Sequence, residues 1–163
     1  MAHHVRVELN LPDPVLVLLV GPSGAGKSTF AREHFAPNQV ISSDELRGWI
    51  ADDPNDQSAS AEAFRVVALI LNGRLRRRLT AVVDATNLRA VNRRGLRSQA
   101  ARYGVPVVAV IFDLPEQTFF DNNARRPDRK VSDEVIATQI EWMREAVDEV
   151  PAEGYAQVVV VGR

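Results

Sequence analysis

A glycine-rich run close to the N-terminus holds the residues best suited to bind phosphate. Residues 21–29 read Gly-Pro-Ser-Gly-Ala-Gly-Lys-Ser-Thr, which matches the spacing G-x-x-x-x-G-K-[ST]. An apolar segment at residues 15–20 precedes the run, and a segment with helical character follows it. Glycines let backbone N–H groups converge on an anion, and the start of the helix adds the positive end of its dipole. The order strand, loop and helix therefore predicts a site for the phosphates of a nucleoside triphosphate.

Individual side chains of this loop have distinct predicted roles. Lys27 is placed to reach the β- and γ-phosphates, and the Ser28 hydroxyl is placed to bind Mg²⁺. An ordinary glycine turn after a strand is the alternative, but a full match with both flanks is rare by accident. The predicted ligands are ATP or another nucleoside triphosphate and Mg²⁺. The predicted contacts with the nucleotide come from Gly21, Ser23, Gly24, Ala25, Gly26, Lys27, Ser28 and Thr29.

A carboxylate follows the second predicted strand. Transfer of a phosphoryl group to an alcohol needs such a group to accept the hydroxyl proton. Asp44 is therefore the candidate general base, with an N-cap role for the next helix as the alternative. Arg47 lies three residues later on the same helix face. It either holds an anionic group of the acceptor or pairs with Asp44 at the surface.

A second carboxylate, Asp84, ends the third predicted strand, where it is expected to help orient Mg²⁺. The next residue is Ala85, whereas a motor ATPase usually carries a glutamate there to orient the attacking water. This difference favours a kinase over an ATP-hydrolysing machine. Thr86 and Asn87 are either further orienting residues or a polar turn before the next helix.

A basic segment follows the fourth predicted strand and its helix. Arginines that close over a γ-phosphate neutralise the charge on its oxygens. The segment is therefore predicted to be a lid over the nucleotide, with a solvated basic loop as the alternative. Its arginines are Arg125, Arg126 and Arg129.

A second group of arginines recurs at three- and four-residue spacing around a predicted helix from about residue 90 to 103. Such spacing places side chains on one helix face. The group is either a basic stripe for a nucleic-acid backbone or a solvated helix face. Its members are Arg89, Arg93, Arg94 and Arg97.

The elements that must position these residues alternate along the chain. Strands are predicted at 16–20, 39–42, 81–84, 105–112 and 157–161, with helices between them. Ser60 and Ser132 are the predicted caps of two long helices, and Pro115 is predicted at the first position of another. This alternation predicts an α/β, P-loop NTPase fold, with a five-stranded parallel sheet, helices on both faces and an arginine-bearing lid. Ligands of such sheets bind at the carboxyl ends of the strands.

Length and composition limit the class of protein. The 163 residues predict one domain, residues 1–163, and the formal net charge is −1. The absence of cysteine excludes disulfides and thiolate metal sites. No apolar run is long enough to span a membrane, and the first residues do not resemble a signal peptide. We therefore expect a cytoplasmic protein with no membrane partner.

Five sequence blocks together resemble a known family. They are V-G-P-S-G-A-G-K-S-T-F-A-R-E-H-F, V-I-S-S-D-E-L-R-G, D-D-P-N-D-Q-S-A, V-V-D-A-T-N and A-R-R-P-D-R. They resemble the 5′-polynucleotide kinase domain of bacterial polynucleotide kinase-phosphatase RNA-repair enzymes. They also resemble, more loosely, the kinase domain of phage polynucleotide kinases. The resemblance runs from about residue 15 to 161, and its second and third blocks are more specific than the phosphate-binding loop.

The resemblance implies transfer of the γ-phosphate of ATP or another nucleoside triphosphate to a 5′-OH end of RNA or DNA. It implies that Asp44 is the general base, that Arg47 contacts a phosphate of the acceptor, and that Arg126 and Arg129 belong to the lid. The family often has an arginine near position 122, where this chain has Asn122. In the family, phosphatase and ligase modules commonly accompany the kinase in a longer chain. The alternatives are a kinase of a small-molecule alcohol and a non-catalytic nucleotide-binding switch.

Overall fold

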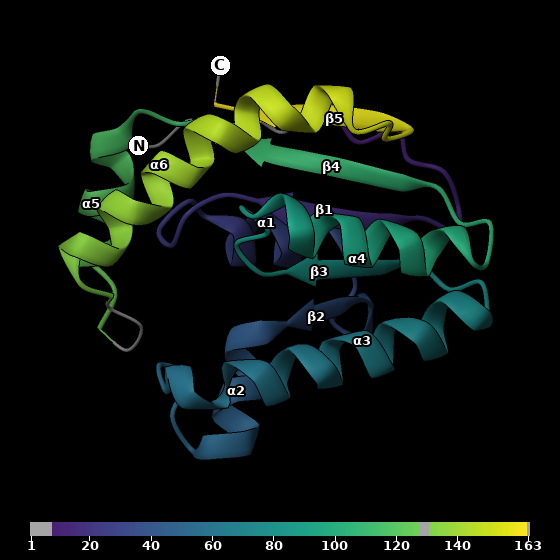
Figure 1. Ribbon diagram of the computed structural model, residues 1–163, viewed down its shortest axis with the longest axis horizontal. Helices are drawn as coiled ribbons and strands as arrows, with labels where there is room; N and C mark the ends of the chain where they lie inside the picture. The colour runs from purple at the N-terminus through teal and green to yellow at the C-terminus, as the bar shows by residue number, and fades with distance from the viewer. Residues whose placement is uncertain (1–7, 128–130, 163) are drawn as a thin grey trace.

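The computed structural model describes residues 8–127 and 131–162. Five parallel strands form one sheet in the order β2-β3-β1-β4-β5 (Figure 1). The strands are β1 (Leu16–Val20), β2 (Val40–Ser42), β3 (Ala81–Asp84), β4 (Val107–Phe112) and β5 (Gln157–Val161). All five residues of the central strand β1 are buried, because helices cover both of its faces. This burial explains the continuous apolar run that precedes the phosphate-binding loop.

Within the described residues, six α-helices and three short 3₁₀ turns connect the strands. The helices are α1 (Lys27–His34), α2 (Ser43–Ala51), α3 (Ser60–Arg76), α4 (Ala90–Ala101), α5 (Glu116–Ala124) and α6 (Asp133–Glu149). The 3₁₀ turns are η1 (Pro37–Gln39), η2 (Gln57–Ala59) and η3 (Val150–Ala152). The strands point toward α5 and α6, so their carboxyl ends gather at that side of the molecule (Figure 1).

Two apolar cores lie on opposite faces of the sheet. Alternate residues of β1 belong to one core or the other, because successive side chains of a strand point to opposite faces of the sheet. One core joins Leu16, Leu18 and Val20 to side chains of α3 and α4, including Val67, Leu71, Leu75 and Ala100. The other joins Val17 and Leu19 to α1 and α5 through Phe30, Ala31 and Phe119. Helices on both faces of a five-stranded parallel sheet confirm the predicted fold class.

The start of α2 decides between the two roles considered for Asp44. Ser42 is the N-cap, and its hydroxyl accepts a hydrogen bond from the Glu45 N–H at 3.3 Å. Asp44 is already the second residue of the helix, so the N-cap interpretation is wrong. The reason is that β2 ends at Ser42 and α2 begins at the next residue, without an intervening loop.

Other helix ends agree only in part with the prediction. Ser132 caps α6 as predicted, because its side chain accepts from the Val135 N–H. Ser60 is the first residue of α3 rather than its cap, since η2 runs directly into the helix. The N-cap position of α3 is Ala59, which supplies no side-chain hydrogen bond, and the nearest side-chain cap is that of η2, where the Asp56 carboxylate accepts from the Ser58 N–H. Pro115 is the N-cap of α5, whereas the sequence predicts it at the first helical position, so α5 begins one residue later than predicted.

The arginines around α4 do not form one exposed stripe. The side chain of Arg93 is fully buried and forms ion pairs with Glu149 and Glu153, both at 2.7 Å. It also donates to the backbone oxygens of Asn87 and Leu88 at 3.1 and 2.7 Å. Burial opposes its charge, but the hydrogen bonds and negative charge of the glutamates outweigh burial and raise the pKa of Arg93. Arg93 is therefore neither a nucleic-acid contact nor part of a solvated face.

Two other arginines of this group also have partners inside the protein. Arg97 donates to the Glu153 carbonyl and lies over the Tyr155 ring, 5.3 Å from its centroid. The Arg89 guanidinium lies 4.7 Å from the centroid of the Trp142 ring.

None of the helices in the described part of the chain combines the length and the apolar character that a membrane span needs.

Candidate active site

The phosphate-binding loop has a backbone that needs glycine. Gly24 and Gly26 have φ values of +81° and +87°, which residues other than glycine rarely adopt. A Cβ at Gly24 would lie 2.6 Å from the carbonyl O of Phe119, so α5 touches the loop directly. A Cβ at Gly26 would meet nothing within 4 Å, and this residue lines a cavity. The loop is thus packed on one side and accessible on the other, as an anion cradle must be.

Lys27 begins α1 and turns its side chain back into the loop. Its Nζ donates to the carbonyl O of Gly21 at 2.9 Å and to that of Pro22 at 2.8 Å. Burial lowers the pKa of Lys27 from its ordinary value of 10.5 to about 8. The charges of Asp84 and Asp44 oppose this shift, whereas Arg126 adds to it. An anion at the loop would stabilise the charged form of this lysine.

Ser28 and Asp84 connect the loop to the neighbouring strand. The Ser28 Oγ donates to Asp84 Oδ2 at 2.7 Å. Asp84 ends β3, which pairs with both β1 and β2, and it stands opposite Ser42 in the register with β2. A hydroxyl and a carboxylate are hard oxygen ligands of the kind Mg²⁺ prefers. Ser28 and Asp84 therefore fit a Mg²⁺ ion beside the phosphates. No group of three or more His, Cys, Asp or Glu side chains suited to a metal occurs in the described ranges.

Asp44 and Arg47 form an ion pair on the first turns of α2. Arg47 is held further by its Nε, which donates to the carbonyl O of Pro54 at 2.9 Å. The Arg47 side chain is 11% exposed and that of Asp44 is 35% exposed. Arg47 is therefore a largely buried partner rather than a surface one. The ion pair fixes the Asp44 carboxylate at the edge of a large cavity.

One large cavity, of about 1090 Å³, brings most of the predicted residues together. It lies at the carboxyl ends of the strands, between the phosphate-binding loop and parts of α2, α3, α5 and α6. The residues that the sequence predicts for the site and that line this cavity are Ser23, Gly24, Ala25, Gly26, Lys27, Ser28, Thr29, Asp44, Arg47, Asp84, Thr86, Arg125 and Arg126. Gly21 lies behind the loop, with its carbonyl on Lys27. Arg129 lies outside the described residues.

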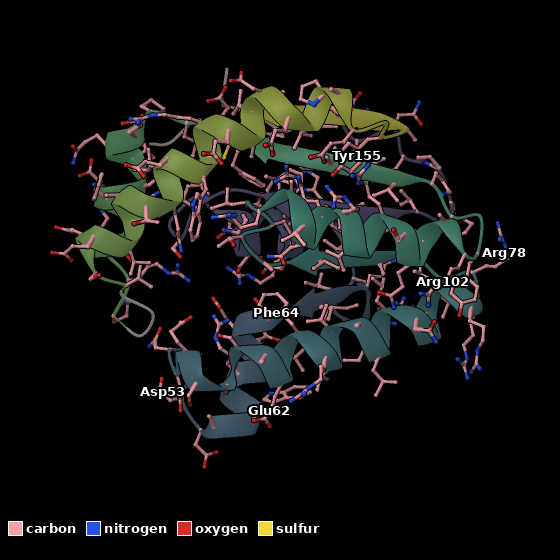
Figure 2. The ribbon with its side chains drawn as sticks, viewed as in Figure 1. Asp53, Glu62, Phe64, Arg78, Arg102 and Tyr155 are labelled. Atoms are coloured by element: carbon pink, nitrogen blue, oxygen red, sulfur yellow. The ribbon has the colours of Figure 1, made fainter. Side chains whose placement is uncertain are left out.

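Other lining residues were not predicted as site residues. Asn55 and Gln57 come from the D-D-P-N-D-Q block and line the cavity next to α2. Figure 2 shows Phe64 on α3, where it faces the sheet, and it lines the cavity with Trp142 of α6. Gln139 lines it one turn before Trp142. The sequence block marks Asn55 and Gln57, whereas no local pattern marks Phe64, Gln139 and Trp142, because these three reach the cavity from helices that meet only in the folded chain.

Asn87 has a structural role at the back of the site. Its side chain is buried, and its Nδ2 donates to the carbonyl O of Leu19 at 2.8 Å. The Thr86 carbonyl accepts from the Gly21 N–H at 3.0 Å. The segment after β3 thus ties the end of β1 to the start of the phosphate-binding loop.

A parallel sheet with a glycine loop and lysine after its central strand defines a protein of the P-loop kinase fold. Residues 16–150 match the AAA domain family AAA_33, and the chain belongs to this family. No curated protein is similar enough in sequence to count as a match.

Solved structures with this fold include several kinases. A gluconokinase from Sinorhizobium meliloti 1021 is 20% identical with a TM-score of 0.59, over 93% of this chain and 84% of its own. A shikimate kinase from Acinetobacter baumannii in complex with shikimate is 18% identical with a TM-score of 0.55, over 92% and 84%. A chain of a Pnkp1/Rnl/Hen1 complex is 23% identical with a TM-score of 0.59, over 78% of this chain. This chain covers only 45% of that chain's length. At these identities the likeness shows the fold alone.

Proposed function

We propose that this protein is an ATP-dependent polynucleotide 5′-hydroxyl kinase, which moves the γ-phosphate of a nucleoside triphosphate to a 5′-OH end of RNA or DNA. The observation that carries the proposal is the presence of two chemistries in one cavity. Lys27 and Ser28 supply a site for a triphosphate, and Asp44 with Arg47 supplies a carboxylate beside it. A nucleotide-binding switch has no use for the second pair.

The chemistry assigned to these residues follows from their types and positions. Asp44 accepts the proton of the acceptor hydroxyl as the acceptor oxygen bonds to the γ-phosphorus. The bond from the γ-phosphorus to the β–γ bridging oxygen breaks, and the nucleoside diphosphate leaves with that electron pair. Lys27, Arg125 and Arg126 neutralise charge on the phosphate oxygens. Ser28 and Asp84 are the residues that would hold Mg²⁺, which would supply further positive charge to the phosphate oxygens.

The acceptor side favours part of a polymer. The cavity of about 1090 Å³ is slightly larger than the range of roughly 300–1,000 Å³ found for single small ligands, so it has room for a donor and part of an acceptor. Arg47 presents a guanidinium suited to a phosphate, and Asn55 and Gln57 add amides that can bind a sugar or base. These three residues belong to the two sequence blocks that most specifically resemble polynucleotide kinases.

The test is transfer of labelled γ-phosphate from ATP, with Mg²⁺, to a short single-stranded oligonucleotide with a 5′-OH. A matched oligonucleotide with a 5′-phosphate and the Asp44→Asn variant are the controls. We expect label only on the 5′-OH strand and only with Asp44 present. ATP binding without transfer to any strand would contradict the acceptor assignment.

A second candidate is a kinase of a small-molecule alcohol. The observation in its favour is that none of the described α4 residues lines the cavity, so the arginines of that helix add no basic surface to it. Shikimate, which is bound in the shikimate kinase structure, and gluconate, the acid from which gluconokinase takes its name, are the first acceptors to try in the same assay. Label on either of them, and none on the oligonucleotide, would favour this candidate.

A further inference from the structure

Two amide side chains hold one turn of the phosphate-binding loop from two different helices. Asn122 of α5 donates from Nδ2 to the carbonyl O of Gly24 at 2.8 Å. Gln139 of α6 accepts at Oε1 from the N–H of Ser23, also at 2.8 Å. The bonds span 98 and 116 residues of sequence. We propose that Asn122 and Gln139 are positioning residues that hold the Ser23–Gly24 turn in the conformation that binds phosphate.

Close packing shows that the turn has little freedom to lie elsewhere. The carbonyl O of Phe119 and the N of Asn123 would lie 2.6 and 3.2 Å from a Cβ at Gly24, so the turn touches the backbone of α5. The Asn122 bond begins from this same helix turn. The Asn123 Nδ2 donates to the Val131 carbonyl O at 2.8 Å, and its Oδ1 accepts from the Val131 N–H at 3.2 Å. These two bonds hold the end of α5 next to the start of α6. The two helices thus form one support for the loop.

The two amides act where Lys27 does not. Lys27 donates to the carbonyls of Gly21 and Pro22, the residues just before the turn. If Lys27 turned toward a phosphate, those bonds would weaken, but the bonds of Asn122 and Gln139 would remain. Their neutral groups also add no charge to a site already supplied with cations. A loop held in place before the ligand arrives loses less conformational freedom on binding, which raises affinity.

This inference rests on the proposed nucleotide site but not on any acceptor, so we test it by binding. Calorimetry with ADP and Mg²⁺ would compare the parent protein with Gln139→Met, Asn122→Ala and the double variant. Gln117→Met is the matched control, because Gln117 is an exposed amide of α5 whose Nε2 bonds to Asp121, outside the cavity. The melting temperature of each protein without ligand is measured alongside.

We expect each single variant to raise the Kd for ADP roughly fivefold, the loss expected for one hydrogen bond. The double variant should raise the Kd for ADP by clearly less than the product of the two single-variant factors, because both bonds hold the same turn. The control should bind ADP like the parent. In the transfer assay, the KM for ATP should rise while the KM for the acceptor stays the same.

Two outcomes would overturn the inference. One is an unchanged Kd for ADP in both single variants, whether or not the melting temperature falls, because the bonds would then be merely structural. The other is a double variant whose effect equals the product of the singles, because the two residues would then act independently. Either single variant carries the first test if the other does not fold. Failure of transfer to oligonucleotides, with the ADP results as expected, would count against the acceptor alone.

Discussion

Ser28 and Asp84 meet across the carboxyl edge of the sheet, where the Ser28 hydroxyl donates to Asp84 Oδ2 at 2.7 Å. They are 56 residues apart in sequence and come together because β3 pairs directly with β1. The bond gives the hydroxyl a defined orientation, and both residues line the cavity. This is the arrangement that a support for a Mg²⁺ ligand requires.

Replacing that support should weaken binding only when Mg²⁺ is present. We expect Asp84→Asn to raise the Kd for ADP with Mg²⁺ by roughly 10-fold or more, because the amide no longer carries the negative charge that orients the site. The Kd without Mg²⁺ should change little. Calorimetry under both conditions checks this, with Asp121→Asn on the exposed part of α5 as the control. An equal loss with and without Mg²⁺ would show that Asp84 has a structural role.

The affinity for nucleotide should depend on pH through Lys27. Burial lowers the pKa of this lysine to about 8, so it loses its proton above that pH in the free protein. Phosphate binds the charged form, so ATP affinity should be constant below pH 8 and fall above it. Calorimetry across pH 6.5 to about 9.5 measures this, and Lys27→Met should bind weakly with no such fall.

Lys27 also makes the free energy of unfolding depend on pH. The direction is opposite to that for a lysine whose pKa is raised by an ion-pair partner. Its pKa is about 8 in the folded protein and ordinarily 10.5, so the unfolded chain binds more protons between these values. The free energy of unfolding should therefore rise with pH through this window, by the part that Lys27 contributes. Urea titrations of the parent and Lys27→Met at several pH values would reveal the difference, and parallel curves would contradict it.

Asp44→Asn should slow transfer far more than it affects binding. The amide keeps the shape of the side chain but cannot accept the hydroxyl proton, so kcat should fall by about 10²–10⁴. The Kd for ADP should stay close to that of the parent. The neighbouring Glu45→Gln is the control, since Glu45 is exposed and outside the main cavity. A variant that transfers at the parent rate would remove Asp44 from the mechanism, and loss of ADP binding would make it a structural residue.

Arg93 should matter for stability and not for substrate binding. Arg93→Met removes a fully buried cation that two glutamates face, and breaking such an arrangement costs about 3–5 kcal/mol. Arg94→Met changes an exposed residue of the same helix and should shift stability by no more than about 0.5 kcal/mol. Denaturant unfolding of both variants measures the contrast. Similar stabilities, with a loss of oligonucleotide binding in Arg93→Met, would restore the basic-stripe interpretation.

The fold and the phosphate-binding loop could both be predicted from the sequence. All five strands are where the short apolar runs predict them, within two residues at each end, because buried parallel strands leave an uninterrupted apolar signal. Lys27, Asp44 and Asp84 share a cavity for a reason that also follows from sequence. Each lies at or just after the end of a parallel strand, and those ends meet at one edge of the sheet.

Which polar side chains support the fold and which face the cavity could not be predicted from local sequence, because this depends on how the helices pack. The spacing of Arg93 marks a helix face, but its partners Glu149 and Glu153 lie 56 and 60 residues away on another part of the chain. The bonds of Asn122 and Gln139 to the loop likewise join distant segments. Hydrogen bonds and ion pairs of this kind depend on the relative placement of helices. That placement comes from packing of both cores, and no local pattern of residues records it.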